Sequence, residues 1–218
     1  MMKTKFLLLA SLLLASFSCK KDQPLTAPQA GLISYFNFDD NLKDQKGYTT
    51  DGVKTGTPPY IAGVKGKAVS FNGIDQKIVF SPKISLINNS FTVSLWVKDE
   101  TDDGSKFFMT GNGFYISTSA NNITFSMNTQ GNTLAVLGPN SLNQWTHIVS
   151  IYDGINMSIY INGVLANSKN NPGSIAGFDS GFSLGGHQAT YWTGSIDQLY
   201  IYNRALSQAE VTQLYNLK

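Results

Sequence analysis

Short hydrophobic stretches alternate with turns rich in glycine and asparagine along the chain from residue 31 onward. The clearest stretch, 91–97, places Phe91, Val93, Leu95 and Val97 on one face. A period of two is typical of a β-strand with one buried face, and many short strands predict a sandwich or barrel. The predicted strands are 32–38, 68–71, 77–80, 91–97, 107–110, 114–118, 123–128, 145–152, 157–161, 164–166, 182–184 and 192–203.

The ends of these stretches carry turn signals. Asn162-Gly163 separates 157–161 from 164–166, and this dipeptide is the strongest short-range indication of a two-residue hairpin. Asn72-Gly73 marks another turn, after 68–71. The pattern therefore predicts strands that are mostly antiparallel neighbours.

One helix is predicted, at 208–217 near the C-terminus. Ser207 and Glu210 have the spacing of a capping box, in which each side chain accepts a hydrogen bond from the other residue's backbone N–H. Val211 and Leu214 then give the helix an apolar face. The chain should therefore end in a short helix packed on a sheet.

The first residues have the composition of a secretory signal. An apolar run at 6–17, too short to span a bilayer stably, precedes Cys19, the only cysteine. Cysteine at this place resembles the lipidation site of Bacteroidetes-type bacterial lipoproteins, although Ser16 and Phe17 depart from the strict motif. The resemblance implies a signal peptide at 1–18, lipidation of Cys19 and a tether at 19–30. The alternative is an ordinary secretory signal.

Composition and charge limit the choice of partners. Removal of residues 1–18 takes away two lysines and leaves 14 basic and 14 acidic side chains, a formal net charge of zero. Arg204 is the only arginine. Nucleic acid is therefore excluded as an expected partner, because its phosphates demand a basic face. Neutral partners such as sugars suit this composition.

Four blocks in order resemble LamG-like, concanavalin A-like jelly-roll domains, and they span nearly all of 31–218. The departures are Gln198, where a second acid is common, and Asp39-Asp40, where Asp-Gly is common. The resemblance implies an all-β, two-sheet antiparallel jelly-roll sandwich with a short C-terminal helix. The blocks are LISYFNFDDNLKDQKG, VSFNGIDQKIVF, FTVSLWVK with WTHIVSIYDGINMSIYINGVLA, and GSIDQLYIYNRALSQAEV.

Glycoside hydrolysis needs two carboxyl groups on either side of the scissile bond. The chain has two glutamates, of which Glu100 lies in an acidic stretch at 99–103 and Glu210 belongs to the helix cap. That stretch is expected to be a solvated loop. No predicted strand carries acids at alternate positions. His147 lies within a predicted strand, His187 lies in a predicted loop, and no serine has the sequence context of a nucleophile. We therefore expect no catalytic residues.

The family resemblance also implies a structural calcium. Carried over by position, its ligands would come from Asp197 in the last strand, the region of Asp39 and the region of Gly73. Calcium requires six to eight oxygens, which carboxylates and backbone carbonyls can supply. The alternative is that Asp197 accepts backbone hydrogen bonds, with Arg204 or a lysine balancing its charge.

A sugar site combines aromatic faces with amide or hydroxyl groups. The 185–192 segment offers His187, Tyr191 and Trp192, and Tyr115 lies in a second such region. These four residues are the candidate ligand-binding residues, although aromatic residues in this family are mostly part of the core.

The sequence thus favours a non-catalytic, lipid-anchored module at the outer membrane or cell surface that binds carbohydrate or mediates adhesion. The alternatives are a protein-interaction or structural subunit of a surface complex and, less favoured, a divergent glycoside hydrolase. The expected partners are a glycan or a surface protein, and the expected state is a monomer.

Overall fold

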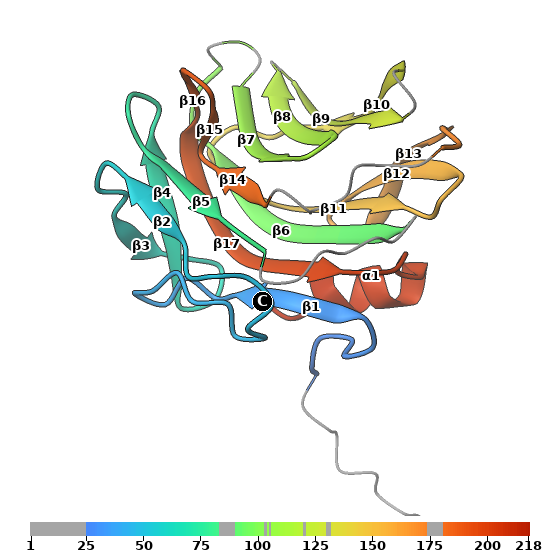
Figure 1. The fold of residues 1–218 in the computed structure, drawn as a ribbon, viewed down its shortest axis with the longest axis horizontal. Coiled ribbons are helices and arrows are strands. Elements are labelled where there is room, and N and C mark those ends of the chain that lie inside the picture. The colour runs from blue at the N-terminus through green and yellow to red at the C-terminus, as the bar shows by residue number, and fades with distance from the viewer. Residues whose placement is uncertain are drawn as a thin grey trace, which may run out of the picture.

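The computed structural model describes residues 25–82, 90–102, 104, 106–119, 121–129, 132–173 and 181–218. These residues form two antiparallel sheets stacked as a sandwich, with one short helix, α1 (Gln208–Tyr215) (Figure 1). The predicted all-β jelly-roll class is confirmed. Cys19 and the predicted signal peptide lie outside the described residues.

One layer, the helix-side sheet, carries α1 on its outer face. Val211 and Leu214 of α1 pack there against Val149, Tyr200 and Tyr202. The strands of this sheet are, in order, β13 (Val164–Asn170), β12 (Asn156–Ile161), β11 (Trp145–Tyr152), β6 (Phe91–Asp99), β17 (Thr193–Tyr202), β4 (Lys67–Asn72) and β3 (Tyr60–Ala62), and β1 (Leu32–Phe36) pairs with β17.

The second layer is the opposite sheet. Its last strand along the chain is followed by a small hairpin, β15 (Gly186–His187) and β16 (Thr190–Tyr191). The strands of the opposite sheet are, in order, β10 (Asn132–Pro139), β9 (Asn122–Thr129), β8 (Phe114–Ser119), β7 (Lys106–Gly111), β14 (Phe182–Leu184), β5 (Lys77–Phe80) and β2 (Val53–Thr55).

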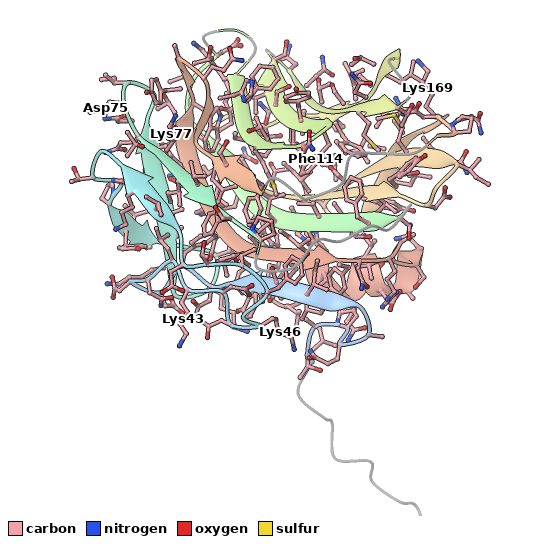
Figure 2. All side chains as sticks on the ribbon, in the orientation of Figure 1. Lys43, Lys46, Asp75, Lys77, Phe114 and Lys169 are labelled. Atoms are coloured by element: carbon pink, nitrogen blue, oxygen red, sulfur yellow. The ribbon has the colours of Figure 1, made fainter. Side chains whose placement is uncertain are left out.

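The core lies between the two sheets. Alternate residues of β6 point into it, as the sequence pattern predicts, and Phe91, Val93 and Leu95 are all buried. Phe114 of β8 approaches from the other layer and packs with its ring centroid 5.3 Å from that of Phe91. Figure 2 shows Phe114 between the sheets, whereas Lys169 lies at the periphery. Burial of each such side chain contributes about 1.5–3 kcal/mol.

A bulge in β17 lets this long strand change its neighbour. The β17–β6 register shifts between Asp197 and Tyr200, and Gln198 has a positive φ of 49°. Before the bulge, β17 pairs with β4, and after it with β1. The extra residue bends the strand locally, which is what a bulge does in antiparallel pairs.

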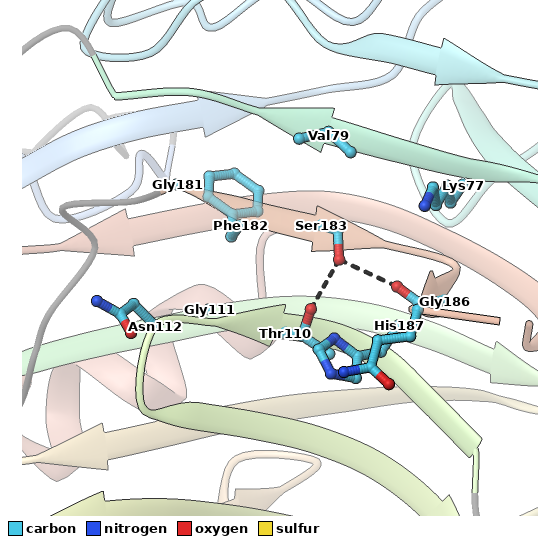
Figure 3. A pocket seen from close by; sticks show the side chains of 11 residues that line it. Lys77, Val79, Thr110, Gly111, Asn112, Gly181, Phe182, Ser183, Gly186 and His187 are labelled. Atoms are coloured by element: carbon cyan, nitrogen blue, oxygen red, sulfur yellow. Dashed lines mark hydrogen bonds between the residues drawn. The ribbon is translucent and has the colours of Figure 1, made fainter. Parts of the chain in front are cut away.

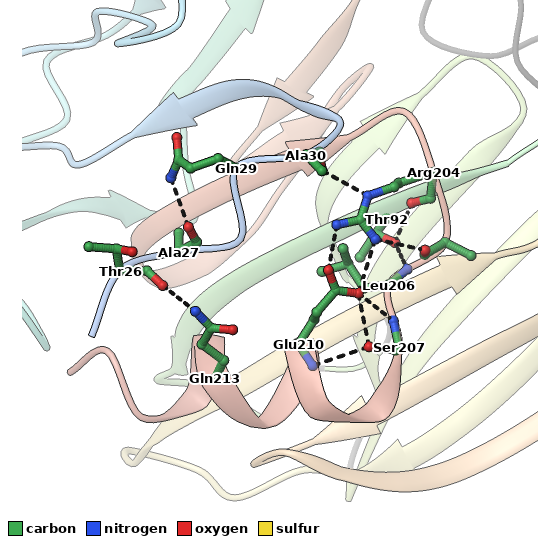
Figure 4. A network of polar contacts seen from close by, with 11 residues as sticks. Thr26, Ala27, Gln29, Ala30, Thr92, Arg204, Leu206, Ser207, Glu210 and Gln213 are labelled. Atoms are coloured by element: carbon green, nitrogen blue, oxygen red, sulfur yellow. Dashed lines mark hydrogen bonds and ion pairs between the residues drawn. The ribbon is translucent and has the colours of Figure 1, made fainter. Parts of the chain in front are cut away.

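The predicted capping box at α1 is present, and it belongs to a larger network (Figure 4). Arg204 forms two hydrogen bonds to the Glu210 carboxylate and donates from Nε to the Ala30 carbonyl at 2.7 Å. Gln213 donates to the Thr26 carbonyl. The described part of the predicted tether, 25–30, is therefore hydrogen-bonded to the domain. Within the described ranges, no helix has the length and apolarity needed to cross a membrane.

Candidate functional site

A groove of about 350 Å³ lies on the outer face of the opposite sheet (Figure 3). Its floor is formed by β5, β14 and β7, and β15 with the following Gln188 borders it. Most of its lining side chains are polar but uncharged, or small. The lining residues are Lys77, Val79, Thr110, Gly111, Asn112, Gly181, Phe182, Ser183, Gly186, His187 and Gln188.

Strand alternation determines which side chains reach the groove. On β5, Ile78 and Phe80 are buried in the core, so Lys77 and Val79 face outward, and Val79 is 39% exposed. On β14, Ser183 lies between two core residues and faces outward in the same way. The register pairs Ser183 with Val79 on one side and with Thr110 on the other. These three residues therefore form one row across the floor.

The Thr110–Ser183 pair has a defined direction of hydrogen bonding. The two hydroxyl oxygens lie 2.7 Å apart, and Ser183 Oγ donates its proton to the Gly186 carbonyl at 3.0 Å. Because a hydroxyl has only one proton, Thr110 must donate to Ser183. The remaining lone pairs of the two oxygens are acceptors, which can receive hydrogen bonds from the hydroxyl groups of a ligand.

Aromatic rings adjoin this row of hydroxyl groups. The His187 ring meets the Tyr115 ring edge-on, with centroids 5.6 Å apart, and the Phe107 ring at 5.8 Å. Phe107 and Tyr115 are 5.4 Å apart and tilted. All three side chains are partly exposed. The site thus combines hydroxyl groups with aromatic surface, as a sugar-binding site requires.

The predicted ligand residues do not all reach this site. His187 lines the groove, and Tyr115 lies beside it through its ring contact with His187. Tyr191 is partly exposed on β16 but is not among the lining residues. Trp192 is 0% exposed, so the expectation that it stacks on a ligand is corrected.

Trp192 is a core residue that anchors the end of the hairpin. Its indole packs against Phe71 and Phe108, and Nε1 donates to the Asp99 carboxylate at 2.9 Å. Asp99 also accepts a hydrogen bond from Asn140 at 2.7 Å. An indole N–H in the core needs such a partner, because an unpaired buried donor is costly.

Sequence reasoning missed the polar floor. Lys77, Thr110 and Ser183 carry no motif, and only their alternation with the core residues of β5, β7 and β14 could have indicated that they face outward. The convergence of the three strands depends on pairing between segments far apart in the chain. The outward position of Phe107 could not be predicted, because the register of β7 shifts between Phe107 and Met109 and this shift breaks the period of two.

Acids do not contribute to the groove. No described residue that lines it is aspartate or glutamate. The expectation of a solvated acidic loop at 99–103 is corrected for its first residue, because Asp99 is buried. Glu100 is partly exposed and pairs with Lys98 at 2.8 Å. Both carboxylates have structural partners away from the groove.

His147 is also part of the packing rather than of a reactive site. It lies buried on the outer face of the helix-side sheet, where its ring packs against Trp96 and Tyr215 of α1. Its Nε2 is hydrogen-bonded to Ser94 Oγ at 2.9 Å. Burial lowers the pKa of His147 to about 3, because the charged imidazolium loses its hydration.

Asp197 is fully buried next to the β17 bulge. Its carboxylate accepts hydrogen bonds from the backbone N–H groups of Lys65 at 3.0 Å and Gln198 at 2.7 Å. Burial raises its pKa to about 6, and the N–H donors offset part of that rise. Arg204 is engaged with Glu210 and does not balance this charge.

The three predicted calcium positions do not converge. Asp39 accepts a hydrogen bond from Lys67 N at 2.8 Å, so Asp39 and Asp197 both contact the 63–67 loop. Gly73 lies beyond the other end of β4 and approaches Thr193. In the described ranges no three His, Cys, Asp or Glu side chains gather as a metal site. Backbone N–H donors engage both Asp197 oxygens, so this carboxylate has hydrogen-bond partners without a metal, and calcium binding stays a prediction.

Several solved structures resemble this fold. Domain 4 of AbnA, a GH43 extracellular arabinanase from Geobacillus stearothermophilus solved in complex with arabinotriose, has a TM-score of 0.72 and 29% identity over 86% of this chain and 99% of that chain. The receptor-binding domain of botulinum neurotoxin C/D mosaic serotype has a TM-score of 0.73 and 16% identity over 85% of this chain and 51% of that chain. The second likeness shows the fold alone.

Sequence comparison gives a relative and a family. Paraclostridial mosquitocidal protein 1 of Paraclostridium bifermentans is 28% identical in an alignment of 210 residues that covers 81% of this chain and 16% of that protein. The chain therefore corresponds to a small part of this relative. A family model described as the concanavalin A-like lectin/glucanases superfamily matches residues 46–212. With most of its length matched, the chain belongs to the concanavalin A-like lectin/glucanases superfamily.

Proposed function

We propose that the chain is a carbohydrate-binding module and that its ligand lies in the groove over β5, β14 and β7. The Thr110–Ser183 pair carries this proposal, because its free lone pairs face the groove beside a cluster of partly exposed rings. Sugar hydroxyl groups need acceptors, and the apolar faces of sugar rings need aromatic partners. The site offers hydroxyl acceptors in the Thr110–Ser183 row of the sheet and aromatic rings directly beside that row.

The similar proteins are consistent with a binding role. The arabinanase domain is described in complex with arabinotriose, and two others are receptor-binding domains of botulinum neurotoxins. The binding domain of botulinum neurotoxin DC is described in complex with SialylT, and the cell entry of botulinum neurotoxin type C is described as dependent upon interaction with two ganglioside molecules. These similarities support a glycan ligand for a chain of the same fold. The class of sugar has to be inferred from the residues of this chain's own groove.

In this proposal the groove binds sugar without cleaving it. A glycosidase needs one carboxyl group as acid and a second as nucleophile or base, on either side of the bond. Two carboxyl groups near the groove-forming strands in sequence are used elsewhere: Asp75 accepts a hydrogen bond from Asn72 at 2.8 Å, and Asp99 accepts one from Trp192. Release of reducing sugar from any polysaccharide would refute this part.

A glycan array with full-length protein, in a detergent without a sugar headgroup, tests the proposal. We expect saturable binding to a defined oligosaccharide. Thr110→Val, which removes the hydroxyl at constant shape, should weaken it about twofold to tenfold, the worth of one hydrogen bond. Tyr115→Ala should weaken it about fivefold through lost ring contact.

Tyr160→Ala is the matched control, because Tyr160 lies on β12 in the other sheet. Its affinity should equal that of the wild type. An array on which no glycan binds, together with envelope proteins that co-purify, would replace this proposal with the protein-interaction role.

We also propose that Cys19 anchors the protein at the outer membrane or cell surface. The support is the position of this single cysteine directly after an apolar run in the sequence. Mass spectrometry of the N-terminal peptide should detect acyl chains on Cys19. Cys19→Ala should move the protein from the membrane fraction to the soluble fraction, and retention of that variant in membranes would contradict the anchor.

A further inference from the structure

The groove has two chemically different ends. Figure 3 shows Lys77 and His187 flanking one end, on opposite sides of the floor, while Asn112 lies at the other. Thr110 and Ser183 occupy the middle. A ligand along this floor would therefore meet hydroxyl groups in its centre and an ammonium group at one end.

Lys77 has no carboxylate partner among the described residues. Ion pairs among the described residues include Lys67 with Asp40, Lys98 with Glu100, and Arg204 with Glu210, and none of these involves Lys77. The acid closest to Lys77 in sequence is Asp75, whose side chain accepts a hydrogen bond from Asn72 in the preceding turn. The groove thus carries a positive charge that no lining residue neutralises.

The position of Lys77 suits contact with a ligand. Lys77 and Val79 are two residues apart on β5 and share its outer face, so their Cα atoms lie about 7 Å apart along the strand. Val79 pairs directly with Ser183. A flexible stem of four carbons lets the lysine ammonium approach a substituent of a sugar that rests on this row.

We infer that the ligand is an acidic glycan, whose carboxylate or sulfate group pairs with Lys77 while its hydroxyl groups bind the Thr110–Ser183 pair. This inference rests on the proposed function and names the sugar class for that same site. Neutral sugars would leave the ammonium group with water as its only partner, whereas an anionic substituent gains an ion pair there. Lys77 would then determine specificity, and the hydroxyl pair would supply contacts that any sugar can use.

The test compares oligosaccharides in matched pairs that differ only in oxidation at C6: glucose with glucuronic acid, galactose with galacturonic acid, and mannose with mannuronic acid. A fourth arm uses sulfated galactose oligomers. Affinities are measured by calorimetry for the full-length wild type, Lys77→Gln and Lys43→Gln. Lys43 is an exposed lysine on the helix-side part of the molecule, so Lys43→Gln changes net charge equally without touching the groove (Figure 2).

We expect an acidic member to bind about fivefold more tightly than its neutral counterpart at 0.1 M NaCl, the upper range for a partly exposed ion pair. This ratio should approach one in Lys77→Gln and stay near five in Lys43→Gln. It should also fall at 1 M NaCl, where the screening length shortens from about 10 Å to about 3 Å. Preference for the sulfated arm alone, lost in Lys77→Gln, would identify the anionic group as sulfate.

Two outcomes overturn the inference in distinguishable ways. If neutral members bind as tightly as acidic ones, or if the preference persists in Lys77→Gln, the inference fails while carbohydrate binding stands. If no member binds and the wider array also shows no binding, carbohydrate binding itself fails, and the inference fails with it.

Discussion

Trp192→Phe tests whether this tryptophan serves the core or a ligand. The substitution keeps an aromatic ring but removes the indole N–H that donates to Asp99 and part of the ring that packs on Phe71 and Phe108. We expect a large loss of stability, because the side chain is 0% exposed. An exposed tryptophan that only stacks on sugar would change stability by less than about 0.5 kcal/mol.

Two contributions set the magnitude. The lost hydrogen bond to a buried carboxylate is worth about 1.5 kcal/mol, the low end of the charged range, because Asp99 keeps Asn140 as a donor. Replacing the indole with the smaller phenyl ring removes buried carbon and leaves a cavity, which costs a further ~1.5 kcal/mol. The total is about 3 kcal/mol, or roughly 6–12 °C in Tm for a chain of this size.

Urea unfolding followed by tryptophan fluorescence and circular dichroism measures this difference. Trp145→Phe is the control, since Trp145 is partly exposed at the start of β11 and should lose less than about 1 kcal/mol. A loss below about 1 kcal/mol for Trp192→Phe, or equal losses for the two variants, would refute the assignment of Trp192 to the core. Unchanged m-values would confirm that both variants unfold from equally compact states.

Three further predictions concern carboxyl groups. The Arg204 contact lowers the pKa of Glu210 from 4.5 to about 2. The Glu210 carboxylate therefore stabilises the folded state fully above pH 4.5, and this stabilisation is lost as pH falls through 2. In Glu210→Gln, the fall in the free energy of unfolding at acid pH, measured by urea titration, should be smaller by about 1 kcal/mol. Burial raises the pKa of Asp197 from 3.8 to about 6. The contribution of the protonated Asp197 side chain to stability is therefore complete below pH 3.8 and lost as pH rises through 6. The free energy of unfolding, measured across this pH range, should fall in this way in the wild type and not in Asp197→Asn. EDTA tests the predicted calcium site: removal of calcium held at 100 times its Kd should cost about 2.7 kcal/mol of stability, whereas an unchanged Tm would mean that the backbone N–H groups alone hold the Asp197 carboxylate.

Local rules predicted the elements whose cause is local. The Asn162-Gly163 turn joins β12 to β13, and Asn162 has the positive φ of 51° that such a turn requires. Ser207 and Glu210 form the predicted capping box. Each feature depends on residues within four positions of one another, so the sequence carries enough information to specify it.

Other elements escaped prediction because their cause is not local. The edge strands β2 and β3 are short, and all three residues of β2 are exposed, so neither has the alternation of a half-buried strand. Trp192 lies in a segment rich in glycine and polar residues, a composition that is typical of an exposed loop. Only the pairing that brings Asp99 and Phe108 to its ring shows that it is core.

The two outer faces of the sandwich explain why the groove lies where it does. On the helix-side sheet, α1 covers outward residues of β6, β11 and β17, and the Trp96 ring, which the alternation of β6 places opposite the core row, stacks 5.6 Å from Tyr215. Residues 25–30 cover more of that face through the Arg204 and Gln213 contacts. The opposite sheet has no such helix among the described residues, so the Ser183 hydroxyl group and the rings beside it stay partly exposed. A ligand that needs both would therefore bind on the opposite sheet, and covering that face with an added helix should abolish binding without affecting the fold.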